Sequence, residues 1–139
     1  MNRYVRLAFI ALSLAALSAN AANEEAIAKA KSAAQSWLAL ADSGNGAMSW
    51  QTAASLFKTA VPQEKWERSL AAARGPFGAL KGRTVSSATY SRTLPGAPDG
   101  EYVVIQYSSR FANKASAVET VTPMREKDGS WRVSGYFIK

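Results

Sequence analysis

The sequence predicts an α+β protein in which N-terminal helices pack on one face of a four-stranded antiparallel sheet. Apolar residues recur at helical spacing up to Gly75, and they alternate with polar residues after Gly82. Turn-forming pairs such as Asp99-Gly100 separate the alternating segments. Helices followed by consecutive hairpin-connected strands are typical of a sheet covered on one side. No internal repeat or long linker divides the chain, so residues 22–139 are expected to form a single domain.

The first 21 residues have the three-part layout of a secretory signal peptide. Two arginines precede an apolar run from Leu7 to Leu17, and small residues stand at positions 19 and 21. The run is shorter than the roughly 20 residues that a membrane-spanning helix needs. We expect cleavage after Ala21 and export to the periplasm, after which the mature chain does not span a membrane; an uncleaved anchor is the alternative. No cysteine follows the run, which argues against a bacterial lipid anchor.

Three helices are expected before residue 76. The first covers residues 23–41, because Asn23 suits an N-cap and Gly44 stands where a left-handed residue often ends a helix. The second covers residues 49–60. The third covers residues 62–75, with Pro62 at its first helical position.

Four strands are expected in the rest of the chain. They cover residues 83–93, 101–111, 117–126 and 131–138. Glycine-containing pairs such as Asp128-Gly129 mark the hairpin connections. Pro123 has no backbone N–H, so it predicts an edge position or a bulge in the third strand.

Several stretches of the mature chain resemble the bacterial family known as domain of unknown function 4019. They are SWQTAASLFKTAV, KWERSLAAARGPFG, LPGAPDGEYVVIQYSSRF, ETV and DGSWRVSGYFI. The resemblance covers about residues 26–138, and the LPGAPDGEY segment is its most specific part. It implies a small exported bacterial protein with a curved sheet similar to the cystatin-like and NTF2-like folds. It implies no activity, ligand or catalytic residue.

The composition excludes several catalytic chemistries. The chain has no His and no Cys, which removes the usual zinc ligands, Ser-His-Asp catalysis and Cys-His catalysis. Glycine motifs that cradle phosphate and calcium-loop patterns are also absent from the sequence. No metal and no other cofactor is therefore expected. The formal net charge is +7, and without Arg3 and Arg6 of the expected signal peptide it is +5, a modest excess that suits contact with anionic envelope components. Nucleic acid is not expected as a partner, because the protein is expected to be exported and shows no recognition motif.

Two carboxylates are candidate general bases in a chain that lacks histidine. Asp42 lies in the last turn of the first predicted helix, and Glu119 lies in the middle of the third predicted strand among apolar residues. A buried Glu119 would suit proton transfer in a cavity. We favour the alternative in which Glu119 faces water or pairs across strands with Arg110 or Arg132.

Aromatic residues form a second candidate set. They are Trp37, Trp50, Trp66, Trp131, Phe57, Tyr102, Tyr107, Phe111, Tyr136 and Phe137. We expect most of them to fill the core, whereas the alternative is an apolar ligand cavity bordered by Trp37 and Trp50. Strict alternation in the last strand would place Trp131, Val133 and Phe137 under the helices. The same alternation would place Arg132 and Tyr136 on the opposite face.

A basic stretch is the third candidate site. No acidic residue occurs between Glu67 and Asp99, whereas five basic residues do. Arg74, Lys81 and Arg83 flank the GPFGALKG loop, and together they would grip a phosphate or carboxylate group. The alternative is a solvated loop with charges that discourage edge pairing of the first strand.

These features favour a non-enzymatic binding or protein-interaction module of the cell envelope. We expect a homodimer formed through a sheet face that carries Tyr102, Arg110, Arg132 and Tyr136, or a complex with another envelope protein or a small apolar or anionic ligand. Two alternatives stay open. One is a hydrolase or isomerase that uses Glu119 or Asp42 as its base, and the other is capture of an anionic envelope fragment by the basic loop.

Overall fold

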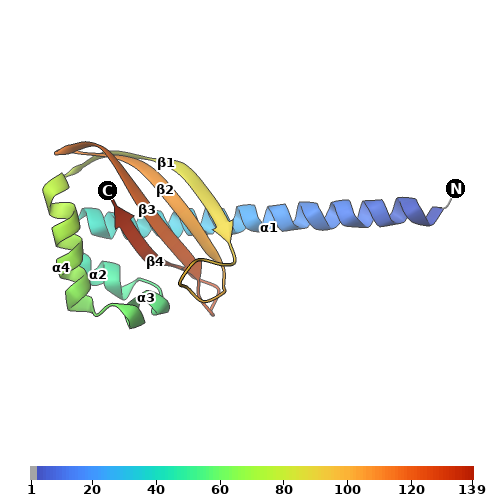
Figure 1. The fold of residues 1–139 in the computed structure, drawn as a ribbon, viewed down its shortest axis with the longest axis horizontal. Helices are drawn as coiled ribbons and strands as arrows, with labels where there is room; N and C mark the ends of the chain where they lie inside the picture. The colour runs from blue at the N-terminus through green and yellow to red at the C-terminus, as the bar shows by residue number, and fades with distance from the viewer. Residues whose placement is uncertain (1–2) are drawn as a thin grey trace.

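A computed structural model of the protein describes the backbone of residues 3–139 and the side chains of residues 18–139. The elements are α1 (Arg3–Asp42), α2 (Gly46–Gln51), α3 (Ser55–Ala60), α4 (Gln63–Arg74), the 3₁₀ turn η1 (Gly75–Phe77), β1 (Leu80–Ser91), β2 (Tyr102–Phe111), β3 (Lys114–Arg125) and β4 (Trp131–Ile138). Helices followed by four adjacent strands confirm the predicted α+β class (Figure 1). The predicted signal peptide includes residues outside the described part of the chain, and its cleavage stays a prediction.

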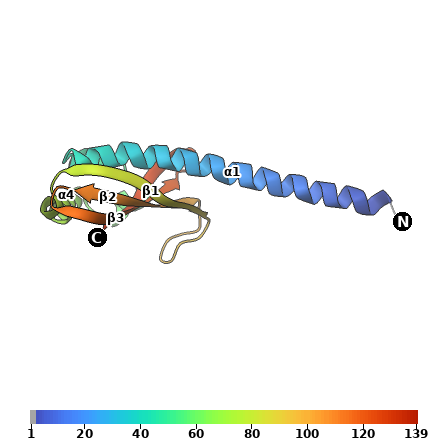
Figure 2. The same ribbon diagram turned by 90° about the horizontal axis from the view of Figure 1, so that it is seen from above.

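The long helix α1 carries one side of the core. Its C-terminal part lies along the sheet, and its N-terminal part extends beyond it (Figures 1 and 2). Gly44 ends the helix with a φ of 74°, a conformation that glycine adopts without steric cost. The predicted start at Asn23 is wrong, because the helical backbone continues through this residue. Alanine and leucine, both strong helix formers, dominate the preceding sequence. Within the part of the chain that the structure describes, no helix has the length and apolar character to cross a bilayer.

The predicted helix over residues 49–60 is two short helices, α2 and α3. Between them Ala54 is extended, and its backbone N–H donates to the carbonyl O of Val133 at 2.8 Å. This bond fastens the connection to β4 at the point where a continuous helix would have used the same donor internally. α4 agrees with the predicted third helix, except that Pro62 is its N-cap rather than its first residue.

The four strands form one antiparallel sheet in the order β1-β2-β3-β4. The predicted strands agree closely with the observed ones, and β4 has the predicted bounds. α1 contacts all four strands, whereas α3 packs against β4 and α2 packs against α4. The β1 side of the sheet is therefore covered mainly by α1.

Bulges in β1 and β4 change which side chains of these strands face the helices. In β1 the register shifts between Leu80 and Gly82, which makes Lys81 an extra residue. In β4 an extra residue, Ser134, lies opposite the step between Thr122 and Pro123. The predicted bulge at Pro123 is thus confirmed. The placement of Phe137 under the helices is wrong, because one extra residue reverses the alternation beyond it, and Phe137 is 62% exposed.

The core lies between α1 and the sheet and is filled by aromatic rings. Trp37 lies between Trp66 and Tyr136, with ring centroids 6.0 Å and 5.1 Å away. Phe57 meets Trp66 edge-on at 4.9 Å. Tyr136 therefore faces the helices, which corrects its expected position on the opposite face.

Candidate functional site

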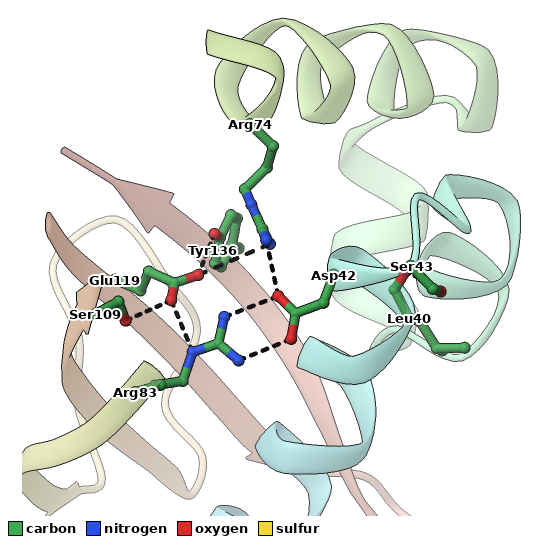
Figure 3. Close-up of polar contacts among 8 residues, drawn as sticks. All are labelled: Leu40, Asp42, Ser43, Arg74, Arg83, Ser109, Glu119 and Tyr136. Carbon is green, nitrogen blue, oxygen red and sulfur yellow. Dashed lines mark hydrogen bonds and ion pairs between the residues drawn. The ribbon is translucent and has the colours of Figure 1, made fainter. Parts of the chain in front are cut away.

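Glu119 lies at the centre of a buried polar network on the helix-facing side of the sheet (Figure 3). Its side chain is 0% exposed. One carboxylate oxygen, Oε1, accepts hydrogen bonds from Arg83 Nε at 2.7 Å and from Ser109 Oγ at 2.6 Å. The other, Oε2, accepts a hydrogen bond from the Tyr136 hydroxyl. The expectation that Glu119 faces water or pairs with Arg110 or Arg132 is therefore wrong.

The two bulges explain why Arg83 and Tyr136 reach this carboxylate. The extra residue Lys81 places Arg83 opposite Ser109, a residue whose side chain points toward the helices. The extra residue Ser134 places Tyr136 opposite Val121, another inward residue. Without either bulge, strict alternation would send the corresponding side chain to the other face of the sheet.

Asp42 joins the network from the last residue of α1. Its two oxygens accept from Arg83 Nη1 and Nη2, both at 2.9 Å, which is a two-point guanidinium–carboxylate pair. Arg74 Nη2 donates to the same carboxylate at 2.8 Å. Arg83 therefore links α1 to β3, since its third bond goes to Glu119 (Figure 3).

Arg74 closes the network from the end of α4. Its guanidinium lies over the Phe111 ring at 4.9 Å, and its Nη1 is 3.9 Å from Glu119 Oε2. Its side chain is 10% exposed. Its Nε and Nη1 are buried and have no hydrogen-bond partner in the described structure. Position and charge, more than hydrogen bonding, thus hold Arg74 beside Glu119.

The network shifts the pKa values of Asp42, Arg83 and Tyr136. Burial raises the pKa of Asp42. Hydrogen bonds and charges from Arg83 and Arg74 lower this pKa by more than burial raises it, so the net pKa is below the usual value. Burial lowers the pKa of Arg83, but hydrogen bonds to Asp42 and Glu119 raise it more. Burial and the nearby Glu119 carboxylate raise the pKa of Tyr136. Tyr136 is therefore a neutral hydroxyl donor, and Arg83 is a cation.

The network contains both of the candidate general bases and two of the three basic residues that the sequence predicted to bind an anion. Asp42, Glu119, Arg74 and Arg83 come together, whereas Lys81 lies exposed on β1. The two arginines hold the protein's own carboxylates, and their two positive charges balance two negative ones. The residues that the structure describes contain no group of acidic side chains arranged to hold a metal ion. The cluster thus has the features of a structural clasp.

An open cleft of about 490 Å³ adjoins the clasp between α1 and β1. Seven residues line it: Lys31, Gln35, Leu38, Leu80, Arg83, Val85 and Tyr107. Arg83 belongs to both the clasp and the cleft. Sequence reasoning missed Lys31 and Gln35, although their spacing with Leu38 and Asp42 places all four on one face of α1.

Of the two tryptophans proposed as ligand contacts, Trp37 belongs to the core and Trp50 packs against it. Trp37 is buried, and its indole N–H donates to the carbonyl O of Ser49 at 2.8 Å. Trp50 is half-buried and donates to the carbonyl O of Val61 at 2.7 Å. Neither lines the cleft between α1 and β1. Trp37 does border a smaller hollow between α1 and β4.

The sheet face proposed for dimer formation does not exist as expected. Tyr102 is buried, with its hydroxyl donating to the carbonyl O of Pro98 at 2.6 Å. Tyr136 points into the clasp. Only Arg110 of the proposed group is exposed, and Arg132 is half-buried. Strict alternation gave the wrong face for Tyr136 because of the Ser134 bulge.

Comparisons with known proteins identify a family and no activity. A family model described as "Protein of unknown function (DUF4019)" matches residues 33–136. No curated protein and no solved structure matches the chain. The cystatin-like or NTF2-like name implied by the resemblance therefore stays a prediction.

Proposed function

The chain belongs to the DUF4019 family, whose description names no activity, and from its own geometry we propose that it is a non-enzymatic module that binds a small ligand in the cleft between α1 and β1. One observation carries this proposal. The strongest charges of the helix-facing side are paired within the clasp, whereas the neighbouring cleft is open and has mixed polar and apolar walls. A volume of about 490 Å³ lies within the range of roughly 300–1,000 Å³ typical of small-molecule sites.

The clasp has little support as a catalytic centre. A general base must reach the substrate proton within hydrogen-bonding distance. Both Glu119 oxygens already accept hydrogen bonds, and the side chain is shielded from solvent. Asp42 is likewise engaged by two arginines. Capture of an anion by Arg74 and Arg83 has little support either, because an anion would have to displace these carboxylates.

Export to the periplasm is part of the proposal. Its support is the basic, apolar and small-residue layout of residues 1–21. N-terminal sequencing of protein released from the cell envelope is expected to begin at Ala22. A sequence beginning at Met1 would contradict cleavage.

Native mass spectrometry of gently released protein tests ligand binding. We expect additional mass that disappears on denaturation. Val85→Trp, which adds bulk inside the cleft, should abolish the additional mass. Thr89→Trp is the matched control, because Thr89 is exposed on the same strand and pairs with Val104 on the other face.

The outcome also separates the two kinds of module. Wild-type protein without additional mass would contradict small-ligand binding. A homodimer or a complex with an envelope protein, again without additional mass, would favour the protein-interaction alternative. Equal retention of the additional mass by both tryptophan variants would place the ligand outside this cleft.

A further inference from the structure

We infer that the cleft between α1 and β1 takes an amphipathic monoanion, with its charged head at Lys31 and Gln35 and its apolar part against Leu38, Leu80 and Val85. The inference rests on the proposed function and adds the chemical class of the ligand. It follows from the balance of charge around the cleft, from the character of its walls and from the order of side chains along α1.

The charge balance leaves one positive charge at the cleft. Within the clasp, two arginines face two carboxylates, so Arg83 contributes no uncompensated charge. Lys31 has no ion-pair partner among the described residues, whereas Lys29, two positions earlier, pairs with Glu25 at 2.9 Å. A single negative charge on the ligand would therefore neutralise the site.

The polar wall can hold a charged head by more than Coulomb attraction. Gln35 lies one helical turn after Lys31, so its amide can donate to the same group. Burial raises the pKa of Tyr107, another wall residue, which keeps its hydroxyl protonated as a donor.

The apolar wall is unusual for this side of the sheet. Val103 and Val121 face the helices and are fully buried. Val85 pairs with the inward residue Tyr107, yet it is 44% exposed. α1 is the main cover of this edge, and Val85 borders the cleft with part of its surface open to solvent. An alkyl chain there would remove apolar surface from water, at roughly 25 cal/mol for each Å² buried.

The two walls give the ligand a direction. Lys31, Gln35 and Leu38 follow one another along the same face of α1, and that face ends at Asp42 in the clasp. A rise of about 1.5 Å per residue separates Lys31 from Leu38 by roughly 10 Å. A head at Lys31 therefore sends an apolar chain toward Leu38 and the clasp.

Isothermal titration calorimetry with sodium decanoate and with decanol tests the inference. The two probes share chain length and differ in charge. Wild-type protein should bind decanoate more tightly than decanol. Lys31→Gln should weaken decanoate binding about two- to fivefold, as expected for loss of one exposed ion pair, and leave decanol binding unchanged. Lys29→Gln is the control, because it removes the same charge from another face of the same helix.

The possible results distinguish this inference from the proposed function. If Val85→Trp abolishes decanoate binding and Lys31→Gln does not weaken it, the cleft binds the probe, but the proposed binding of an anionic head at Lys31 is wrong. Equal binding of decanoate and decanol by the wild type, or binding of neither, also overturns the inference. In these cases the mass of the co-released ligand still decides the proposed function. Decanoate binding that survives Val85→Trp places the probe outside the cleft and overturns the inference, whereas retention of the co-released mass by Val85→Trp contradicts the proposed function as well.

Discussion

The helix-facing side of the sheet contains two neighbouring regions, the clasp and the cleft, which share Arg83. They differ in whether their charged side chains are paired. In the clasp, Asp42 and Glu119 face Arg74 and Arg83, and the group lies between α1, α4 and the sheet. In the cleft, Lys31 has no ion-pair partner among the described residues, and Val85 is 44% exposed. The charges of the clasp are paired with one another, because an unpaired charge buried under several elements would be costly in free energy.

The contrast separates residues that maintain the fold from residues available for binding. Removing a clasp carboxylate leaves arginines buried without their partner. Removing a cleft side chain leaves the remaining groups in contact with water. Clasp variants should therefore change the free energy of unfolding, and cleft variants should change ligand affinity.

The largest expected effect is from Glu119→Ala. We expect a loss of about 3–5 kcal/mol in the free energy of unfolding, because breaking a buried ion pair leaves Arg83 and Arg74 partly uncompensated. Val85→Ala, on the same side of the sheet, should cost no more than about 0.5 kcal/mol. Urea unfolding followed by circular dichroism measures both.

A matched charge variant excludes a general effect of losing a carboxylate. Glu64→Ala removes the exposed partner of Arg68, whose ion pair spans 2.6 Å. Exposed pairs of this kind contribute about 0.2–1 kcal/mol at most. A Glu119→Ala protein as stable as the Glu64→Ala protein would show that the clasp does not hold the fold.

The second prediction sharpens the comparison within β4. Val133→Ala should cost about 2 kcal/mol, because it removes two buried methyl groups and leaves a small cavity. Phe137→Ala should change the free energy of unfolding by no more than about 0.5 kcal/mol, since its side chain lies on the solvent-facing side. Thermal or urea unfolding of the two proteins compares them directly, and a larger cost for Phe137→Ala would contradict the Ser134 bulge.

Sequence periodicity predicted most of the fold because most of it follows local rules. β2 is an example, since its residues from Val103 to Phe111 alternate between buried and less buried positions as the pattern required. Gly44 ended α1 as expected. The division between α2 and α3 escaped prediction, because it depends on a bond from Ala54 to Val133, which is far away in sequence.

The candidate site was predictable as a set of residues and not as an arrangement. Glu119, Asp42, Arg74 and Arg83 were each singled out for charge and position. Their mutual pairing depends on the extra residue Lys81 in β1, which determines the face of the sheet that Arg83 occupies. Gly82 inside the strand was the available signal, because glycine within a strand often marks a bulge.

The third prediction concerns the hydroxyl of Tyr136. Tyr136→Phe keeps the ring against Trp37 and removes the hydrogen bond to Glu119. We expect a cost of about 1.5 kcal/mol, the lower end for a hydrogen bond to a charged group. Tyr90→Phe is the control: its hydroxyl donates to Glu101 at 3.0 Å, in a less buried setting, and its loss should cost less. If urea unfolding gave the same loss of stability for both variants, the buried acceptor Glu119 would contribute no more than the partly exposed acceptor Glu101, which would contradict this prediction.

The smallest expected effect is the contribution of Asp42 to the pH dependence of stability. Its pKa is lower in the folded protein than in the unfolded chain, so the unfolded state binds more protons on acidification. This contribution is complete above the unfolded pKa of about 3.9, and it is lost as the pH falls through the folded pKa. Urea unfolding between pH 7 and pH 3 should therefore show a smaller acid loss for Asp42→Asn than for the wild type, even if Asp42→Asn is less stable at pH 7. The other acidic groups titrate in both proteins, so parallel curves would mean that the arginines do not hold the Asp42 carboxylate in solution.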